Sequence, residues 1–167
     1  MNEHLLALYM GYALCHGIQV QHLLSQGELT VPYVIYWNEE KPTPVPYPAA
    51  TQEEGVAKAR AARDAAQEIT GWSSGREGSV VQKDGTKLDV LFIEGSLPGM
   101  NAPLELLTYY RNDPFRLIAG FMWTPHPQVR KDPPVFMADF QRGIHMHPFG
   151  QQCMSDLQNA ERVQLTR

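Results

Sequence analysis

Two histidines near the C-terminus have the spacing of metal ligands. His145 and His147 are separated by one residue, and in an extended chain residues two apart point to the same side, so both imidazoles would face one ion. Zinc accepts imidazole, thiolate and carboxylate ligands, and His126, Cys153 or Asp139 would complete the shell. The pattern predicts a zinc site on His126, His145 and His147; the alternative is that these are surface or hydrogen-bonded histidines.

The two cysteines, Cys15 and Cys153, lie far apart in the sequence. Two widely spaced cysteines do not form a disulfide framework, and their apolar neighbours predict two buried free thiols in a reducing, cytoplasmic compartment. Cys15 precedes His16, but adjacent helical residues do not face each other, so they do not form a nucleophile and base. Two alternatives stay open: the chain ends meet so that His16 serves Cys153, or the two cysteines are bridged.

Other catalytic patterns are missing from the sequence. It contains no nucleophile elbow, dinucleotide fingerprint or HExxH helix. Asp89 and Glu94, five residues apart in a predicted strand, point to opposite faces and cannot share acid–base work. The sequence therefore favours a non-enzymatic protein that binds a protein partner or a small ligand, and the alternative is a small metal-dependent enzyme that uses the three histidines.

Aromatic and arginine residues supply the candidate binding groups. Large aromatic side chains and arginine are favoured at recognition surfaces; the alternative is that the aromatic residues fill the core. The candidates are Trp72, Arg76, Arg116 and Trp123.

Composition limits the class of protein. The 167 residues are 43% hydrophobic and 19% charged, which is typical of one globular domain. A net charge of −4 gives no general attraction for nucleic acid or an anionic membrane, so we expect neither as a partner.

A β-hairpin over residues 79–95 is the clearest structural signal. Asp84 and Gly85 tolerate the positive φ of a tight two-residue turn, and β-branched and aromatic residues flank them. Strands are predicted over 30–37, 79–83, 88–94 and 115–123, and helices over 51–69, 104–111 and 134–142, with Gly143 as a stop. The expected fold is α+β: a single domain over 1–167, with a mostly antiparallel sheet of about four strands and helices packed on it.

The N-terminal segment predicts one long helix over residues 2–25 that is apolar over most of its circumference. Such a helix packs in the core or against a second subunit, so a homo-oligomer is one further possibility. Glu3 and His4 stand where a signal peptide carries basic residues, and the apolar run is too short to span a membrane.

Two segments are predicted to lack regular packing. The alternating prolines of residues 41–50 favour a stiff, polyproline-like crossover loop, or alternatively a docking segment for a proline-reading partner. Residues 154–167 form a last amphipathic stretch that is predicted to fray.

Overall fold

The computed structural model describes residues 2–24, 28–112, 114–129, 133–163 and 165. The elements in chain order are α1 (Glu3–Leu23), β1 (Tyr33–Asn38), β2 (Lys41–Pro46), α2 (Gln52–Ala65), β3 (Gly71–Val81), β4 (Lys87–Ser96), β5 (Leu104–Arg111), β6 (Arg116–Trp123), α3 (Pro133–Met146) and α4 (Gly150–Gln158).

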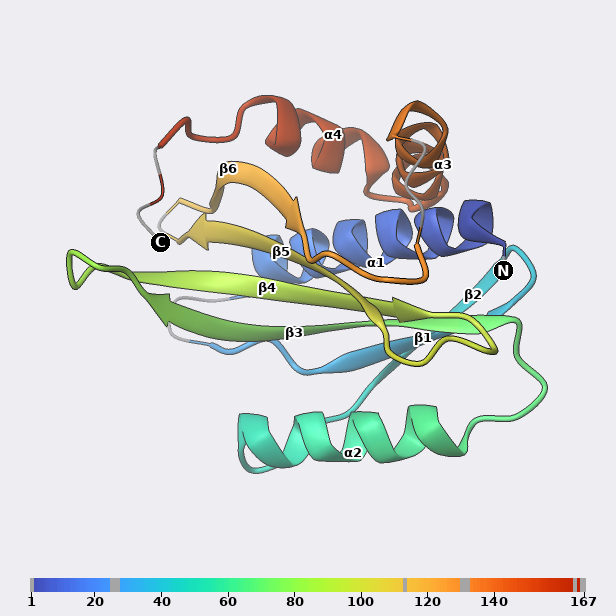
Figure 1. The fold of residues 1–167 in the computed structure, drawn as a ribbon. Coiled ribbons are helices and arrows are strands. Elements are labelled where there is room, and N and C mark those ends of the chain that lie inside the picture. The colour runs from blue at the N-terminus through green and yellow to red at the C-terminus, as the bar shows by residue number, and fades with distance from the viewer. Residues whose placement is uncertain (1, 25–27, 113, 130–132, 164, 166–167) are drawn as a thin grey trace.

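One antiparallel sheet organises these elements in the order β2-β1-β3-β4-β5-β6. Helix α2 lies on one side of the sheet, and α1 lies on the other side, between the sheet and α3 and α4 (Figure 1). The α+β class is thus confirmed, but the described residues form six strands rather than about four.

Helix α1 is the centre of the core. Every residue from Leu6 to Cys15 is buried, which agrees with a helix that is apolar all round and is covered on every side. The apolar surface that motivated a homo-oligomer through residues 2–25 is therefore covered by this chain's own sheet and helices, and the oligomeric state stays a prediction without that basis. Among the described residues, none of the helices has the length and apolarity to cross a membrane.

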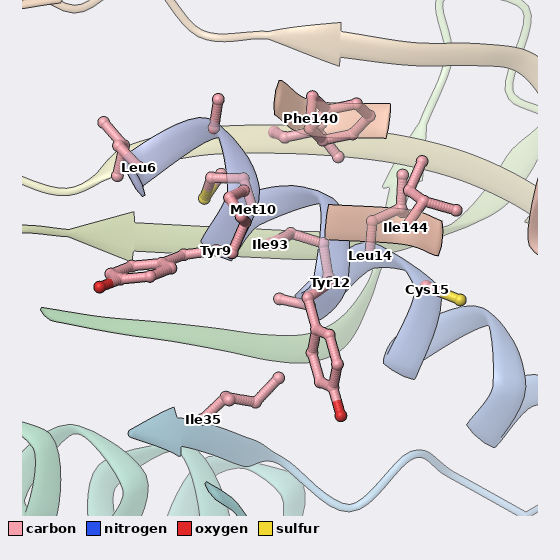
Figure 2. Packing of buried hydrophobic residues seen from close by; sticks show 14 of the residues in the cluster. Leu6, Tyr9, Met10, Tyr12, Leu14, Cys15, Ile35, Ile93, Phe140 and Ile144 are labelled. Atoms are coloured by element: carbon pink, nitrogen blue, oxygen red, sulfur yellow. The ribbon is translucent and has the colours of Figure 1, made fainter. Parts of the chain in front are cut away.

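Two glycines allow α1 and α3 to cross with their backbones in contact. A Cβ atom at Gly11 would lie 2.0 Å from the carbonyl oxygen of Phe140, and one at Gly143 would lie 2.0 Å from that of Leu8. The prediction that Gly143 ends the helix is wrong, because α3 continues to Met146. Figure 2 shows the side chains that fill the space around this crossing.

The proline-rich segment is an edge strand and not the predicted crossover loop. Pro42, Pro44 and Pro46 of β2 lie opposite β1 residues, and the amide of Tyr47 donates to the carbonyl of Pro32 at 2.8 Å. Alternate residues of a strand point their N–H groups to the same side. In β2 the non-proline residues therefore donate toward β1, and the prolines stand at the positions whose N–H groups would otherwise point away from the sheet. A strand without outward donors resists the addition of another chain at this edge.

Three further predictions need correction. Residues 104–111 form β5 and not a helix, because alternate side chains are buried. Strand β3 begins at Gly71, well before the predicted strand start at residue 79, and Gly71 and Gly75 leave room for the rings of Tyr9 and Tyr33. Helix α4 extends to Gln158 and so includes the first five residues of the stretch 154–167 that was predicted to fray.

The predicted hairpin is confirmed, with a longer turn. Strands β3 and β4 pair as far as Val81 and Lys87, and the amide of Gln82 donates to the carbonyl of Thr86 at 2.8 Å. Gly85 has a φ of +83°, which places it in the left-handed region. The loop is therefore a three-residue connection with glycine at its last position, and not the predicted two-residue turn.

The crossing of α1 and α3 gives a stability prediction. We expect Gly11→Ala to lower the free energy of unfolding by at least about 2 kcal/mol, because the added methyl group overlaps the Phe140 carbonyl. In an unpacked helix the same change would stabilise by up to about 1 kcal/mol. Urea denaturation measures the difference. Ala61→Ser on the exposed side of α2 is the control and should stay within about 0.5 kcal/mol of the wild type; a neutral Gly11→Ala would contradict the close crossing.

Candidate functional site

An apolar pocket of about 150 Å³ opens between α3, α4 and β6. Phe140 and Ile144 of α3 are fully buried at its base, whereas the side chains from α4 and β6 are partly exposed. Two exposed glutamines stand among the lining residues. The lining consists of Phe121, Met137, Phe140, Gln141, Ile144, Met154, Leu157 and Gln158.

A bulge in β6 directs the aromatic wall of this pocket. The register between β5 and β6 shifts between Leu107 and Tyr109, and Ala119 and Gly120 have φ values of 57° and 71° there. The hydroxyl of Thr108 donates to the carbonyl of Gly120 at 2.5 Å and holds the bulge. A non-glycine residue at positive φ is strained and is retained only where its surroundings fix it.

Beyond the bulge, the aromatic side chains of β6 pack on α3. The ring of Phe121 lies 5.0 Å from that of Phe140, and Trp123 lies 5.2 Å from Phe140 and 5.1 Å from Phe136. Trp123, a predicted binding residue, therefore packs against Phe136 and Phe140 and is not one of the residues that line the pocket.

His147 fixes the turn between α3 and α4. Its Nδ1 accepts a hydrogen bond from the amide of Phe149 at 3.1 Å, and its carbonyl accepts one from the amide of Gly150 at 2.9 Å. The first turn of α4 is thereby anchored, and the helix directs Cys153 toward α1 while Met154 and Leu157 reach the pocket.

A cluster of thiols and imidazoles lies where α4 meets α1. Cys15 on α1 and Cys153 on α4 are fully buried free thiols. Nε2 of His147, which precedes α4, lies 3.3 Å from Nδ1 of His16 on α1. The two ends of the chain thus meet, which was one of the alternatives left open by the sequence, and the cysteines are free thiols.

The cluster changes the acidity of its members. The Cys153 thiol, and after it His147, stabilise the Cys15 thiolate against the opposing effect of burial and lower its pKa to about 6. The same contact, together with burial, raises the pKa of Cys153, so Cys15 is the first to lose its proton. Burial and the neighbouring His147 lower the pKa of His16 to about 4.

The predicted zinc ligands do not converge in the structure. Helix α3 includes His145, so the segment is not extended, and residues two apart on a helix do not point the same way. His145 is exposed and His147 is buried, while His126 faces the carbonyl of Ala102 at 2.8 Å. Within the described ranges, no group of three or more histidine, cysteine or acidic side chains is placed to hold a metal ion. Zinc binding stays a prediction without support from this arrangement.

Two predicted binding residues lie on the sheet face that α2 partly covers. The guanidinium of Arg63 stacks on the ring of Trp72 at 4.2 Å and pairs with Glu94 at 2.8 Å. Arg76 stacks on the ring of Phe92 at 4.1 Å.

Arg116 lies apart from them, at the start of β6. It forms an ion pair with Glu161 at 3.1 Å. Trp123 is on the opposite side of the sheet from Trp72 and Arg76, so the four predicted binding residues do not form one site.

The sequence missed the pocket residues of both helices. Met137 and Phe140 lie in the predicted helix 134–142, and Met154 and Leu157 lie in the predicted amphipathic stretch 154–167, each pair at helical spacing. Nothing in that spacing indicates that the two segments meet across β6.

Comparisons with known proteins found no match: no protein-family model, curated protein or solved structure is similar to this chain. The interpretation therefore depends on the geometry alone. An apolar pocket with amides among its lining residues can bind a ligand.

The lowered pKa of His16 gives a pH prediction. The unfolded chain takes up a proton near pH 6.5, whereas the folded chain does so only near pH 4, so the unfolded state binds more protons between these values. Stability is therefore fully present above pH 6.5 and is lost as the pH falls toward 4. Between pH 7.5 and 5 we expect a loss of about 2 kcal/mol from this group.

Urea denaturation at the two pH values measures this loss. His16→Gln should remove most of it, and His145→Gln, at an exposed position, should not. An equal pH dependence in the wild type and His16→Gln would show that His16 titrates normally in the folded protein.

Proposed function

We propose that the protein binds a small, mostly apolar molecule in the pocket between α3, α4 and β6. The observation that carries this proposal is a hollow of about 150 Å³ whose lining side chains come from regular elements. Sites on helices and strands hold their geometry better than sites on loops. The sequence predicted a protein that binds either a protein partner or a small ligand, and of these two we propose the small ligand.

The lining indicates the chemical class of the ligand. The pocket is open to solvent on one side, and its leucine, isoleucine and phenylalanine walls favour contact with an apolar group over contact with water. Met137 and Met154 adapt to irregular shapes and contact aromatic rings favourably. The amides of Gln141 and Gln158 can pair with one polar group. A single aromatic ring system with one hydrogen-bonding group fits these features.

The pocket offers binding and no acid–base chemistry. None of its eight lining residues carries a titratable side chain. This supports a non-enzymatic role, and it implies an affinity with little direct dependence on pH.

Two other hollows in the described part of the chain fit a ligand less well. A groove of about 280 Å³ is lined by residues 29–32 and 48–51, which connect elements, and by Gln52 at the start of α2. The hollow between α2 and the sheet has a volume of only about 10 Å³, and Arg63 and Glu94 are among the residues that line it.

Indole is a suitable probe, because it combines a fused aromatic ring with one N–H donor. We expect saturable binding with a dissociation constant on the order of 0.1–1 mM, measured by calorimetry and by chemical-shift changes at α3, α4 and β6. Leu157→Trp fills the pocket with a side chain of its own and should weaken binding at least about tenfold. Leu29→Trp, in the 280 Å³ groove, is the matched control and should bind as the wild type does.

The same measurements can reject the proposal. If indole does not saturate up to its solubility limit, or if Leu157→Trp binds it unchanged while retaining the wild-type fold, the pocket is not a ligand site. Shifts confined to residues 29–32 and 48–52 would place the site in the other groove.

A further inference from the structure

The hollow between α2 and the sheet lies on the side of the sheet opposite the apolar pocket (Figure 1). Its closed part measures only about 10 Å³, and the hollow measures about 250 Å³ when its open mouth is included. The hollow is too small to enclose an apolar ligand, but its mouth carries more positive than negative groups. The charged residues of its lining are Arg60, Arg63, Arg76 and Glu94.

We propose that the mouth of this hollow is an anion site that binds one phosphate group, either of inorganic phosphate or of a small phosphate monoester. The donors are the guanidinium groups of Arg60 and Arg76 and the hydroxyl of Ser74, all of which line the hollow. The proposal does not depend on the function proposed for the apolar pocket.

Strand β3 places Ser74 and Arg76 on the face of the sheet that α2 partly covers. Trp72, Ser74 and Arg76 alternate along the strand and so share one face, and the ring of Trp72 on that face contacts Arg63 of α2. Ser74 is only 8% exposed, and its hydroxyl forms no hydrogen bond with another described residue. This hydroxyl can therefore donate to an oxygen of a bound anion.

Helix α2 supplies Arg60 to the same opening. Val56, Ala59, Arg60 and Arg63 have the spacing of one helix face, and all four line the hollow. Arg60 is exposed and forms no ion pair with any described residue. Arg60 therefore brings to the mouth a positive charge that no described carboxylate neutralises at contact distance.

The other two charged lining residues match each other. Nη1 of Arg63 lies 2.8 Å from Oε2 of Glu94, and both side chains are largely buried. Arg63 also lies 3.4 Å from Asp64, which is mostly exposed. Because the charge of Glu94 is matched at such short range, its repulsion of a bound anion is largely cancelled.

Arg76 is held flat against an aromatic ring. Its Cζ lies 4.1 Å from the ring centroid of Phe92, the residue opposite it in the register of β3 and β4. Nη2 of Arg76 lies 4.0 Å from Glu105, which is too long for a hydrogen bond, and Nε is covered, so the terminal nitrogens are the donors left for a ligand. A guanidinium fixed by stacking loses little freedom when it binds, and its planar fork suits phosphate.

The arrangement favours a tetrahedral dianion over a carboxylate. Arg60 and Arg76 come from different elements around one opening, and an anion with oxygens in several directions can accept from both. A carboxylate carries one charge and has its oxygens in one plane, so it matches a single guanidinium, as Glu94 matches Arg63. A phosphate group, with a charge of about −1.5 to −2 near pH 7, matches two.

Titration of the folded chain with inorganic phosphate tests the proposal, at fixed pH and at an ionic strength held constant with sodium chloride. We expect saturable chemical-shift changes at α2 and around Ser74 of β3, with a dissociation constant on the order of 1 mM. Sulfate, a dianion of the same shape, should displace the phosphate. Acetate should bind at least about tenfold more weakly.

Arginine variants separate a specific site from general attraction. Arg60→Gln and Arg76→Gln should each weaken phosphate binding about tenfold, and Arg76→Lys, which keeps the charge but loses the planar fork, at least about threefold. Arg142→Gln is the matched control, because it removes the same charge from a half-exposed position on α3, and it should bind phosphate as the wild type does.

Glycerol 3-phosphate distinguishes the two sources of the phosphate group. A dissociation constant within about threefold of that of inorganic phosphate assigns the site to phosphate monoesters, because the open mouth leaves the glycerol in solvent. Binding of inorganic phosphate alone assigns the site to the free ion.

The proposal is wrong if the folded wild type shows no saturable shifts at α2 and β3 up to about 20 mM phosphate, or if acetate binds as tightly as phosphate. It is also wrong if Arg142→Gln weakens binding as much as Arg76→Gln does, because the effect is then one of net charge. The first two outcomes are read on the wild type, so they do not require any variant to fold.

Discussion

The close contact of α1 and α3 at Gly11 and Gly143 is the constraint on which the other arrangements depend. Each glycine faces a backbone carbonyl of the other helix, at a distance that excludes any side chain. Because α1 also packs on β3 and β4, this crossing sets the height of α3 above the sheet. That height determines the space left for α4, and therefore the volume of the pocket.

Each edge of the sheet carries a feature that hinders pairing with another strand. At β2, alternate prolines remove the outward N–H donors of that strand. At β6, the amide of Ala119 donates to the carbonyl of Glu161, and the amide of Glu161 donates to the carbonyl of Leu117. The C-terminal segment thus occupies the hydrogen-bonding groups beside the bulge. Recognition by strand addition is disfavoured at both edges, which leaves the helical side of the sheet as the better place for a ligand.

The fold was predictable where local chemistry decides the structure and not where distant contacts do. Turn residues at Asp84 and Gly85 predicted the hairpin, and Thr51 predicted the start of α2, where its hydroxyl accepts from the amide of Glu54. Strand β5 was missed because its leucines and glutamate also suit a helix, and only pairing with β4 and β6 decides between the two. The sequence predicted the meeting of the two chain ends only as an open alternative. The ends come together through the packing of α4 on α1, which no local sequence pattern indicates.

Helix α4 contributes to the core on one side and to the pocket on the other. Cys153 faces α1, and Met154 and Leu157 line the pocket. A nine-residue helix is not stable alone, so it depends on anchors such as the His147 turn and the hydrogen bond between His22 and Asp156 at 2.7 Å. A ligand that packs against Leu157 would add to these anchors and stabilise α4 on the rest of the fold.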